Sequence, residues 1–268
     1  ALSTSIDVIE TDKLTDFGYK SSLNSFSLGT SYEQFENTFF SPKFSISSES
    51  LETTTDASEA YKKQEGSYFD TSFAYGLSFD KRNSAYQPTS GFYSNWYQQL
   101  PLVSENQTIV NGYIITGYKE LADDMIISTG IYSRAVNSLS NDDVRVSRRL
   151  YVPSSRLRGF GSGKVGPKDG DDHVGGNYIV TFNTSSTVPF VLQTQENMDL
   201  KLFFDAGNVW GVDYSSTIDD SNTIRTSTGL ALEITTPVGP LSFSFAQVLS
   251  KASTDKTESF KFQLGTTF

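Results

Sequence analysis

The residues with the strongest potential for chemistry lie between positions 156 and 173, in a stretch rich in glycine. Residues 161–166 fit the G-x-G-x-x-G pattern, but no buried strand precedes them and no helix follows, as a nucleotide-binding loop requires. His173 is the only histidine and the chain has no cysteine, which leaves neither a catalytic triad nor a His/Cys zinc cluster. Asp169, Asp171 and Asp172 offer ligands for a divalent cation, although a solvated acidic loop is the simpler interpretation. We therefore expect no enzyme, no cofactor and no metal.

A different chemistry is indicated by Arg158 in this stretch and Asp205 further along the chain. Asp205 falls on the polar side of an alternating segment, 203–210. If that side lines an enclosed interior, a loop arginine that enters it needs a partner, because an unpaired charge in a confined site is costly. Arg158 and Asp205 are the candidate pair, since the guanidinium binds a carboxylate through two donors. The alternative is that both are solvated charges in a wet interior.

The elements that position these residues are predicted by alternating polarity, which is clearest over the last ten residues. Phe260, Phe262, Leu264 and Phe268 fall on one side and polar residues on the other. This period of two places one apolar and one polar face on an extended strand. About ten residues is also the length of one membrane-crossing strand. The terminal aromatic fits the rim of a barrel at the lipid interface.

The same alternation recurs along the chain and predicts about twelve strands. They lie near 2–12, 20–34, 39–52, 67–81, 91–101, 108–120, 124–137, 177–188, 198–210, 223–236, 239–250 and 259–268. Tight turns such as 34–37 and 237–240 alternate with long polar connections at 52–66, 138–176 and 211–222. Short turns at one end and long loops at the other are typical of an up-and-down membrane barrel. We predict an all-β, transmembrane antiparallel β-barrel in a single domain, 1–268.

The composition excludes several other classes of protein. Of the 268 residues, 37% are hydrophobic and 34 are Tyr or Phe, which is too aromatic for disorder. No run approaches the roughly 18 consecutive apolar residues of a membrane-spanning helix. The net charge of −10, with no basic stripe, argues against a nucleic-acid partner.

The connection 138–176 stands out because it contains no convincing strand. A structureless connection of this length in a compact domain is usually functional or disordered. Its many glycines favour a folded-back loop with unusual backbone angles. We expect this loop to fold back on itself, and disorder is the alternative on composition alone.

Several motifs resemble, in the same order, those of the BamA family of outer-membrane β-barrel assembly factors. They are 158–160 (RGF), 165–168 (VGPK), 175–177 (GGN), 204–210 (FDAGNVW), 239–247 (GPLSFSFAQ) and the terminal strand from 260 to 268. Each motif alone is weak, whereas the ordered set over 150–268 is specific. Residues 1–149 match only as a series of strands, with 86–91 similar to the family's turn before a strand.

The resemblance implies roles for individual residues. Arg158, Gly159 and Phe160 would be the tip of the loop inside the barrel, with Asp205 as its lumenal anchor. The family has a second acidic residue on the preceding strand, where this chain has Asn183. The paired glycines that the family carries just upstream of the tip are replaced by 152–155 (VPSS).

The resemblance also implies a gate at the last strand, which pairs weakly with the first and opens sideways. Phe260, Phe262, Leu264, Gly265 and Phe268 are its candidate residues, with Gly265 at the kink. A client strand would add to the exposed edge, because unpaired backbone groups are costly in lipid. The alternative role for Gly265 is to make room for a lumenal neighbour.

The family's function is the non-enzymatic insertion of β-barrel proteins into the bacterial outer membrane. Its implied partners are unfolded barrel clients, accessory lipoproteins, periplasmic chaperones, and outer-membrane lipid and lipopolysaccharide. The family barrel has about sixteen strands after periplasmic POTRA domains, so we expect a fragment lacking the first strands; a smaller closed barrel is the alternative. A secretion transporter of the same superfamily, a passive porin and, least favoured, a soluble β-sandwich are the other functional classes.

Overall fold

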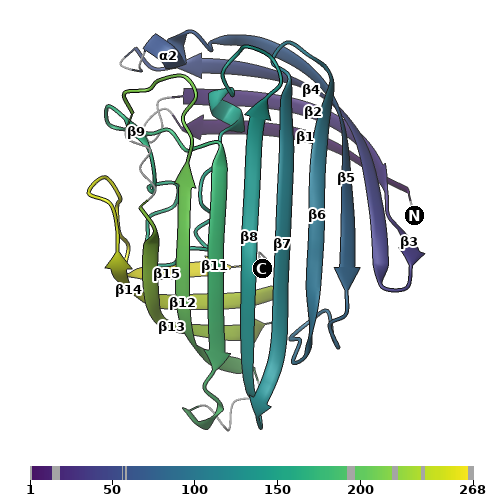
Figure 1. Ribbon diagram of the computed structural model, residues 1–268, viewed down its shortest axis with the longest axis vertical. Coiled ribbons are helices and arrows are strands. Elements are labelled where there is room, and N and C mark those ends of the chain that lie inside the picture. The colour runs from purple at the N-terminus through teal and green to yellow at the C-terminus, as the bar shows by residue number, and fades with distance from the viewer. Residues whose placement is uncertain are drawn as a thin grey trace.

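A curved, 13-stranded antiparallel sheet makes up most of the fold (Figure 1). The computed structural model describes residues 2–13, 19–55, 57, 59–191, 197–218, 223–236 and 239–264. The sheet consists of β1 (Leu2–Lys13), β2 (Tyr19–Thr30), β3 (Tyr32–Phe35), β4 (Thr38–Thr53), β5 (Gly66–Asp80), β6 (Gly91–Ser104), β7 (Thr108–Ala122), β8 (Met125–Ser138), β11 (Tyr178–Thr187), β12 (Met198–Trp210), β13 (Arg225–Thr236), β14 (Gly239–Ser250) and β15 (Phe260–Leu264). A separate two-stranded pair, β9 (Lys168–Asp169) and β10 (Asp172–His173), lies between β8 and β11.

The strands follow one another in chain order, from β1 at one edge of the sheet to β15 at the other. Each pairs antiparallel with its neighbours, while β3 pairs only with β4. The connections that follow β4, β8 and β12 therefore leave the sheet at one end, and the turns 36–37 and 123–124 lie at the other. The antiparallel all-β fold predicted from the sequence is confirmed. Within the described residues, β1 and β15 do not pair with each other.

Side chains alternate between the two faces of the sheet as the polarity pattern predicts. On the outer, convex face, Leu202 is 53% exposed and Phe245 60% exposed. On the concave face, Phe203, Asp205 and Ser227 are buried. An apolar outer surface on every strand is stable only against lipid, because large exposed apolar patches are unfavourable in water.

Two strand predictions need correction. The segment predicted as one strand at 20–34 is divided into β2 and β3, because β2 pairs on both sides whereas β3 follows only β4, with an irregular register between Glu33 and Phe35. The connection 138–176 contains the short pair β9–β10, which is too brief to leave a periodic signal. The last strand was predicted at 259–268; it is described as β15 over Phe260–Leu264, and 265–268 lie outside the described residues.

Residues 139–177, hereafter the inner loop, pack against the concave face of the sheet. Their apolar side chains join those of the strands in one buried cluster, which consists of Val110, Val136, Val144, Leu150, Val152, Leu157, Phe160, Val165, Ile179 and Val209. The chain's own loop thus covers part of the concave face.

Among the described residues, helical structure is confined to short turns in the connections. These are α2 (Glu59–Lys62) and the 3₁₀ turns η1 (Val146–Arg148) and η2 (Pro189–Val191). Across the described ranges, none of the helices has the length and apolar character needed to span a bilayer.

Candidate functional site

Arg158, at the tip of the inner loop, contacts the inward-facing carboxylate of Asp205 on β12. Its Nε donates to Oδ2 and its Nη2 to Oδ1, each at 2.8 Å. The backbone N–H of Arg158 donates to Oδ2 as well, at 3.1 Å. This arrangement is the two-donor match of a planar guanidinium to a carboxylate. The structure therefore brings together the two residues that the sequence paired.

The environment of this pair makes it expensive to break. The Asp205 side chain is 0% exposed and that of Arg158 is 15% exposed. The guanidinium also stacks on the ring of Phe203, with 3.5 Å between its carbon and the ring centroid, a favourable cation–π contact. Removal of one partner from a buried ion pair typically costs about 3–5 kcal/mol, because the remaining charge is left uncompensated.

Asn183 links the pair to the neighbouring strand. It lies opposite Asp205 in the register of β11 and β12. Its amide nitrogen donates to Asp205 Oδ1 at 2.7 Å and to the carbonyl oxygen of Arg156 at 2.7 Å. A carboxylate at this position has no hydrogen to donate and would repel both oxygens. The amide therefore bridges the strand and the loop, where the family has a second acidic residue.

Gly159 and Phe160 fit the loop tip closely against β13 and β14. Gly159 has φ +91°, and a Cβ there would lie 3.1 Å from Ala246 Cβ and 3.1 Å from Val248 Cγ2. Both the backbone angle and the space therefore favour glycine. Phe160 is 2% exposed and belongs to the buried cluster beneath the loop. The carbonyl oxygen of Arg158 accepts a hydrogen bond from Ser227 Oγ at 2.5 Å.

A second arginine–aspartate pair, absent from the sequence-based prediction, joins β13 to the connection 251–259, and its aspartate also contacts the inner loop. Arg225 on β13 donates through Nε to Asp255 Oδ2 at 2.9 Å and through Nη2 to Oδ1 at 3.1 Å. Asp255 also accepts the backbone N–H of Gly166 at 3.2 Å. The inward parity of Arg225 is readable from the alternation, whereas its partner lies in an irregular connection. This pair fixes the far side of the loop tip.

Arg149 makes a third ion pair, with Asp213 in the connection 211–224. Asp213 also accepts the backbone N–H of Val144 at 2.9 Å and the side-chain amide of Asn177 at 3.0 Å. Burial raises the pKa of the Asp213 carboxyl, but the Arg149 charge and these hydrogen bonds outweigh it and hold the pKa below its ordinary value. Asp213 is therefore charged in the folded protein and ties two connections together.

The histidine and the aspartates that the sequence offered for catalysis or metal binding do not form a common site among the described residues. Burial lowers the pKa of His173 to about 4, so this histidine is neutral at physiological pH. Its Nε2 contacts the carbonyl oxygen of Thr254 at 3.2 Å, and its buried Nδ1 has no hydrogen-bond partner. Asp169 accepts a hydrogen bond from the Tyr214 hydroxyl at 3.1 Å. Within the described ranges, no three acidic, histidine or cysteine side chains converge as metal ligands.

The candidate gate strand β15 lies at the edge of the sheet and, in the part of the chain that the structure describes, pairs only with β14. Phe260, Phe262 and Leu264 point outward and are 44–63% exposed. The ring of Phe262 lies 5.0 Å from that of Phe243 on β14, which continues the apolar outer face. The remaining gate candidates, Gly265 and Phe268, lie outside the described residues.

The curved antiparallel sheet, its apolar outer face and the loop on its concave face together define a β-barrel membrane protein whose interior is occupied by its own loop. Residues 3–268 match the Omp85 superfamily domain. The chain belongs to the Omp85 superfamily.

Named relatives and a solved structure agree with this assignment. The chain is 24% identical over 218 residues to the outer membrane protein assembly factor BamA of Neorickettsia risticii, covering 80% of this chain and 29% of that protein. It is 32% identical over 142 residues to BamA of Neisseria meningitidis serogroup B, covering 42% of this chain and 17% of that protein. The crystal structure of Haemophilus ducreyi BamA lacking POTRA domains 1–3 superposes with a TM-score of 0.86 at 24% identity, covering 97% of this chain and 57% of that one. The chain thus spans less than a third of the length of these two curated relatives.

Proposed function

We propose that this chain is the barrel region of a bacterial outer-membrane assembly factor that inserts and folds β-barrel client proteins. The named relatives support the proposal, since both are outer-membrane assembly factors. We further propose that the barrel is one domain, 1–268, and that its work is non-covalent. Its partners would be unfolded barrel clients, accessory lipoproteins, periplasmic chaperones, and the lipid and lipopolysaccharide of the outer membrane.

The observation that carries the proposal is the loop on the concave face. Arg158 and Phe160 hold the loop tip deep against the sheet, where a passive channel would need open space. A porin conducts solutes through a water-filled lumen. A barrel whose interior is occupied by an anchored loop is better suited to act on client strands at its outer surface and at its edge strand.

The edge strand β15 supplies the second part of the proposal. Its outer face is apolar over Phe260, Phe262 and Leu264, while one side of its backbone has no partner strand among the described residues. Unpaired N–H and C=O groups are costly in hydrocarbon, so such an edge accepts an incoming strand readily. A client strand would gain its first backbone hydrogen bonds there, as in other cases of strand addition.

The anchored tip would keep this edge in place. Gly159 lies against β14, the strand with which β15 pairs. The backbone N–H of Glu258, just before β15, donates to the carbonyl oxygen of Gly159 at 3.0 Å. Loop position and edge position are therefore mechanically linked, and we expect loss of the Arg158–Asp205 pair to lower assembly activity.

The proposal is tested with this chain reconstituted in liposomes, both alone and fused behind the N-terminal part of the Haemophilus ducreyi protein. Folding of a client barrel is followed by its heat-dependent shift in gel mobility. The same shift, measured on the chain itself, establishes that it has folded. We expect faster client folding in at least one form, and slower folding with Arg158→Ala. Two folded forms that leave the client's rate unchanged would contradict the proposal and favour a transporter or a porin.

A further inference from the structure

The first limb of the inner loop, residues 144–150, contains an arginine that is more deeply buried than the tip arginine. Arg145 is 2% exposed and donates through Nη1 to Glu49 Oε2 at 2.7 Å. It also contacts both carboxylate oxygens of Asp70, at 3.2 and 3.3 Å. Its guanidinium carbon lies 3.7 Å from the ring centroid of Tyr68. A single arginine thus joins carboxylates of two adjacent strands, β4 and β5.

This cluster is built like the Arg158 site. Each has a guanidinium with two-donor contacts to a buried carboxylate and an aromatic ring beneath the guanidinium, here Tyr68. In each, a further polar side chain donates to a carboxylate of the site: Asn183 to Asp205, and here Ser21 to Glu49, at 2.6 Å. Such a hydrogen bond helps to make a buried charge tolerable. Two sites of the same design hold two separate parts of one loop.

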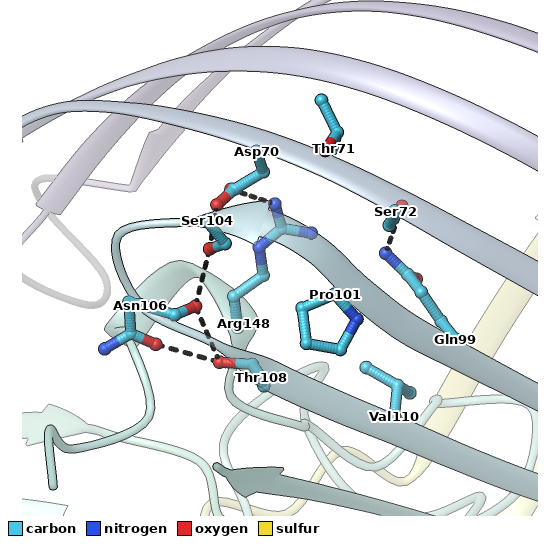
Figure 2. A pocket seen from close by; sticks show the side chains of 10 residues that line it. All are labelled: Asp70, Thr71, Ser72, Gln99, Pro101, Ser104, Asn106, Thr108, Val110 and Arg148. Atoms are coloured by element: carbon cyan, nitrogen blue, oxygen red, sulfur yellow. Dashed lines mark hydrogen bonds and ion pairs between the residues drawn. The ribbon is translucent and has the colours of Figure 1, made fainter. Parts of the chain in front are cut away.

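The positive and negative charges of the cluster also balance. Arg148, in the turn that follows Arg145, donates to Asp70 at 2.9 Å, as Figure 2 shows. Two arginines therefore face two carboxylates, Glu49 and Asp70. Ser104 donates to Asp70 at 2.5 Å. A neutral cluster is suited to holding the loop and leaves no net charge to attract an ion, although the buried Nε of Arg145 has no hydrogen-bond partner.

The two sites lie far apart around the sheet. β6, β7, β8 and β11 separate β5, which carries Asp70, from β12, which carries Asp205. Because the sheet is strongly curved (Figure 1), a loop fixed to both places spans its concave side. Further contacts hold the same limb, including the N–H of Val146, which donates to Gln64 Oε1 at 2.7 Å.

We propose that Arg145, with Glu49 and Asp70 as its receivers, is a second anchor of the inner loop, independent of the Arg158–Asp205 anchor. Arg145 is then a positioning residue that holds the first limb, and the loop is a brace between the two halves of the curved sheet. This inference concerns the loop's attachment and does not depend on the proposed assembly activity.

The test is hydrogen exchange, followed by mass spectrometry, on the full chain reconstituted in liposomes. In Arg145→Ala we expect amide exchange in 144–150 to rise at least tenfold, while exchange in 156–161 changes less than threefold. Arg158→Ala should give the reverse pattern. Arg148→Ala is the matched control, because its side chain is 29% exposed and contacts one carboxylate; it should accelerate the first limb much less than Arg145→Ala.

A further variant separates anchoring from the cost of unpaired charge. Arg145→Met combined with Glu49→Gln and Asp70→Asn removes the buried charges together, which relieves that cost. We expect this variant to unfold more slowly than Arg145→Ala, yet its first limb should still exchange rapidly. The inference is overturned by unchanged exchange in Arg145→Ala, by equal acceleration of both segments, or by full protection of the first limb in the triple variant.

Discussion

The energetic coupling between Arg158 and Asp205 can be worked out from their contacts. Arg158→Ala leaves the Asp205 carboxylate, which is 0% exposed, with only Asn183 and one backbone N–H as donors. It loses two charge-assisted hydrogen bonds, and the expected cost is about 3–5 kcal/mol of unfolding free energy. Asp205→Ala leaves the guanidinium over Phe203 without a carboxylate partner, at a similar cost in unfolding free energy. The double variant removes both charges, so its cost should fall about 2–3 kcal/mol short of the sum of the singles.

The assay is equilibrium unfolding by urea in bilayers, followed by the fluorescence of Trp96 and Trp210. An exposed ion pair provides the control. Lys20 and Glu10 lie 2.5 Å apart with side chains 31% and 63% exposed, and their coupling should stay below about 1 kcal/mol. Additive single effects at Arg158 and Asp205, within about 0.5 kcal/mol, would show that the buried pair does not act as a unit and would refute the reasoning.

Three further predictions follow from the loop. Gly159→Ala should lower stability by about 2–3 kcal/mol and increase protease cleavage of the loop, because backbone strain at φ +91° adds to two 3.1 Å contacts of the new Cβ. Gly170→Ala is the control: Gly170 has φ +59° and open space around it, so this substitution should cost about 1 kcal/mol. Asn183→Asp should destabilise the chain by about 1–3 kcal/mol at neutral pH, since the new carboxylate faces Asp205 without a hydrogen to donate. This loss of stability should shrink as the pH falls. Unfolding midpoints that do not change with pH would contradict this prediction. Folding favours the neutral form of His173, so the stability of the chain should fall by roughly 3 kcal/mol as the pH drops from 6.5 to about 4. A His173→Gln variant that loses the same stability over this pH range would contradict the prediction.

Alternation made most of the sheet predictable. The segments 198–210 and 239–250 correspond residue for residue to β12 and β14, because each has a strict period of two and is bounded by turn residues. The same parity placed Asp205 on the concave face. The cost of an unpaired arginine then pointed to Arg158 as its partner, and the two lie 2.8 Å apart.

The rest of the site depends on how distant segments meet. Arg145 and Glu49 are 96 residues apart in the chain, and the irregular loop gives no periodic signal that aims Arg145 at β4. Their contact follows from the curvature of the whole sheet. Asp255 likewise lies in an irregular connection, so only the inward parity of its partner Arg225 was readable.

The most direct test of strand templating uses the absence of cysteine from this chain. Single cysteines are introduced at Phe260, Phe262 or Leu264 on β15, and a second cysteine is moved along the terminal strand of a client during its folding in liposomes. If client strands add to β15, we expect disulfide cross-links in a single register. Moving the cysteine by two residues along β15 should then shift the preferred client position by two residues. Cross-links that are absent, or that form equally at every client position while the client folds at the accelerated rate, would contradict templating at this edge.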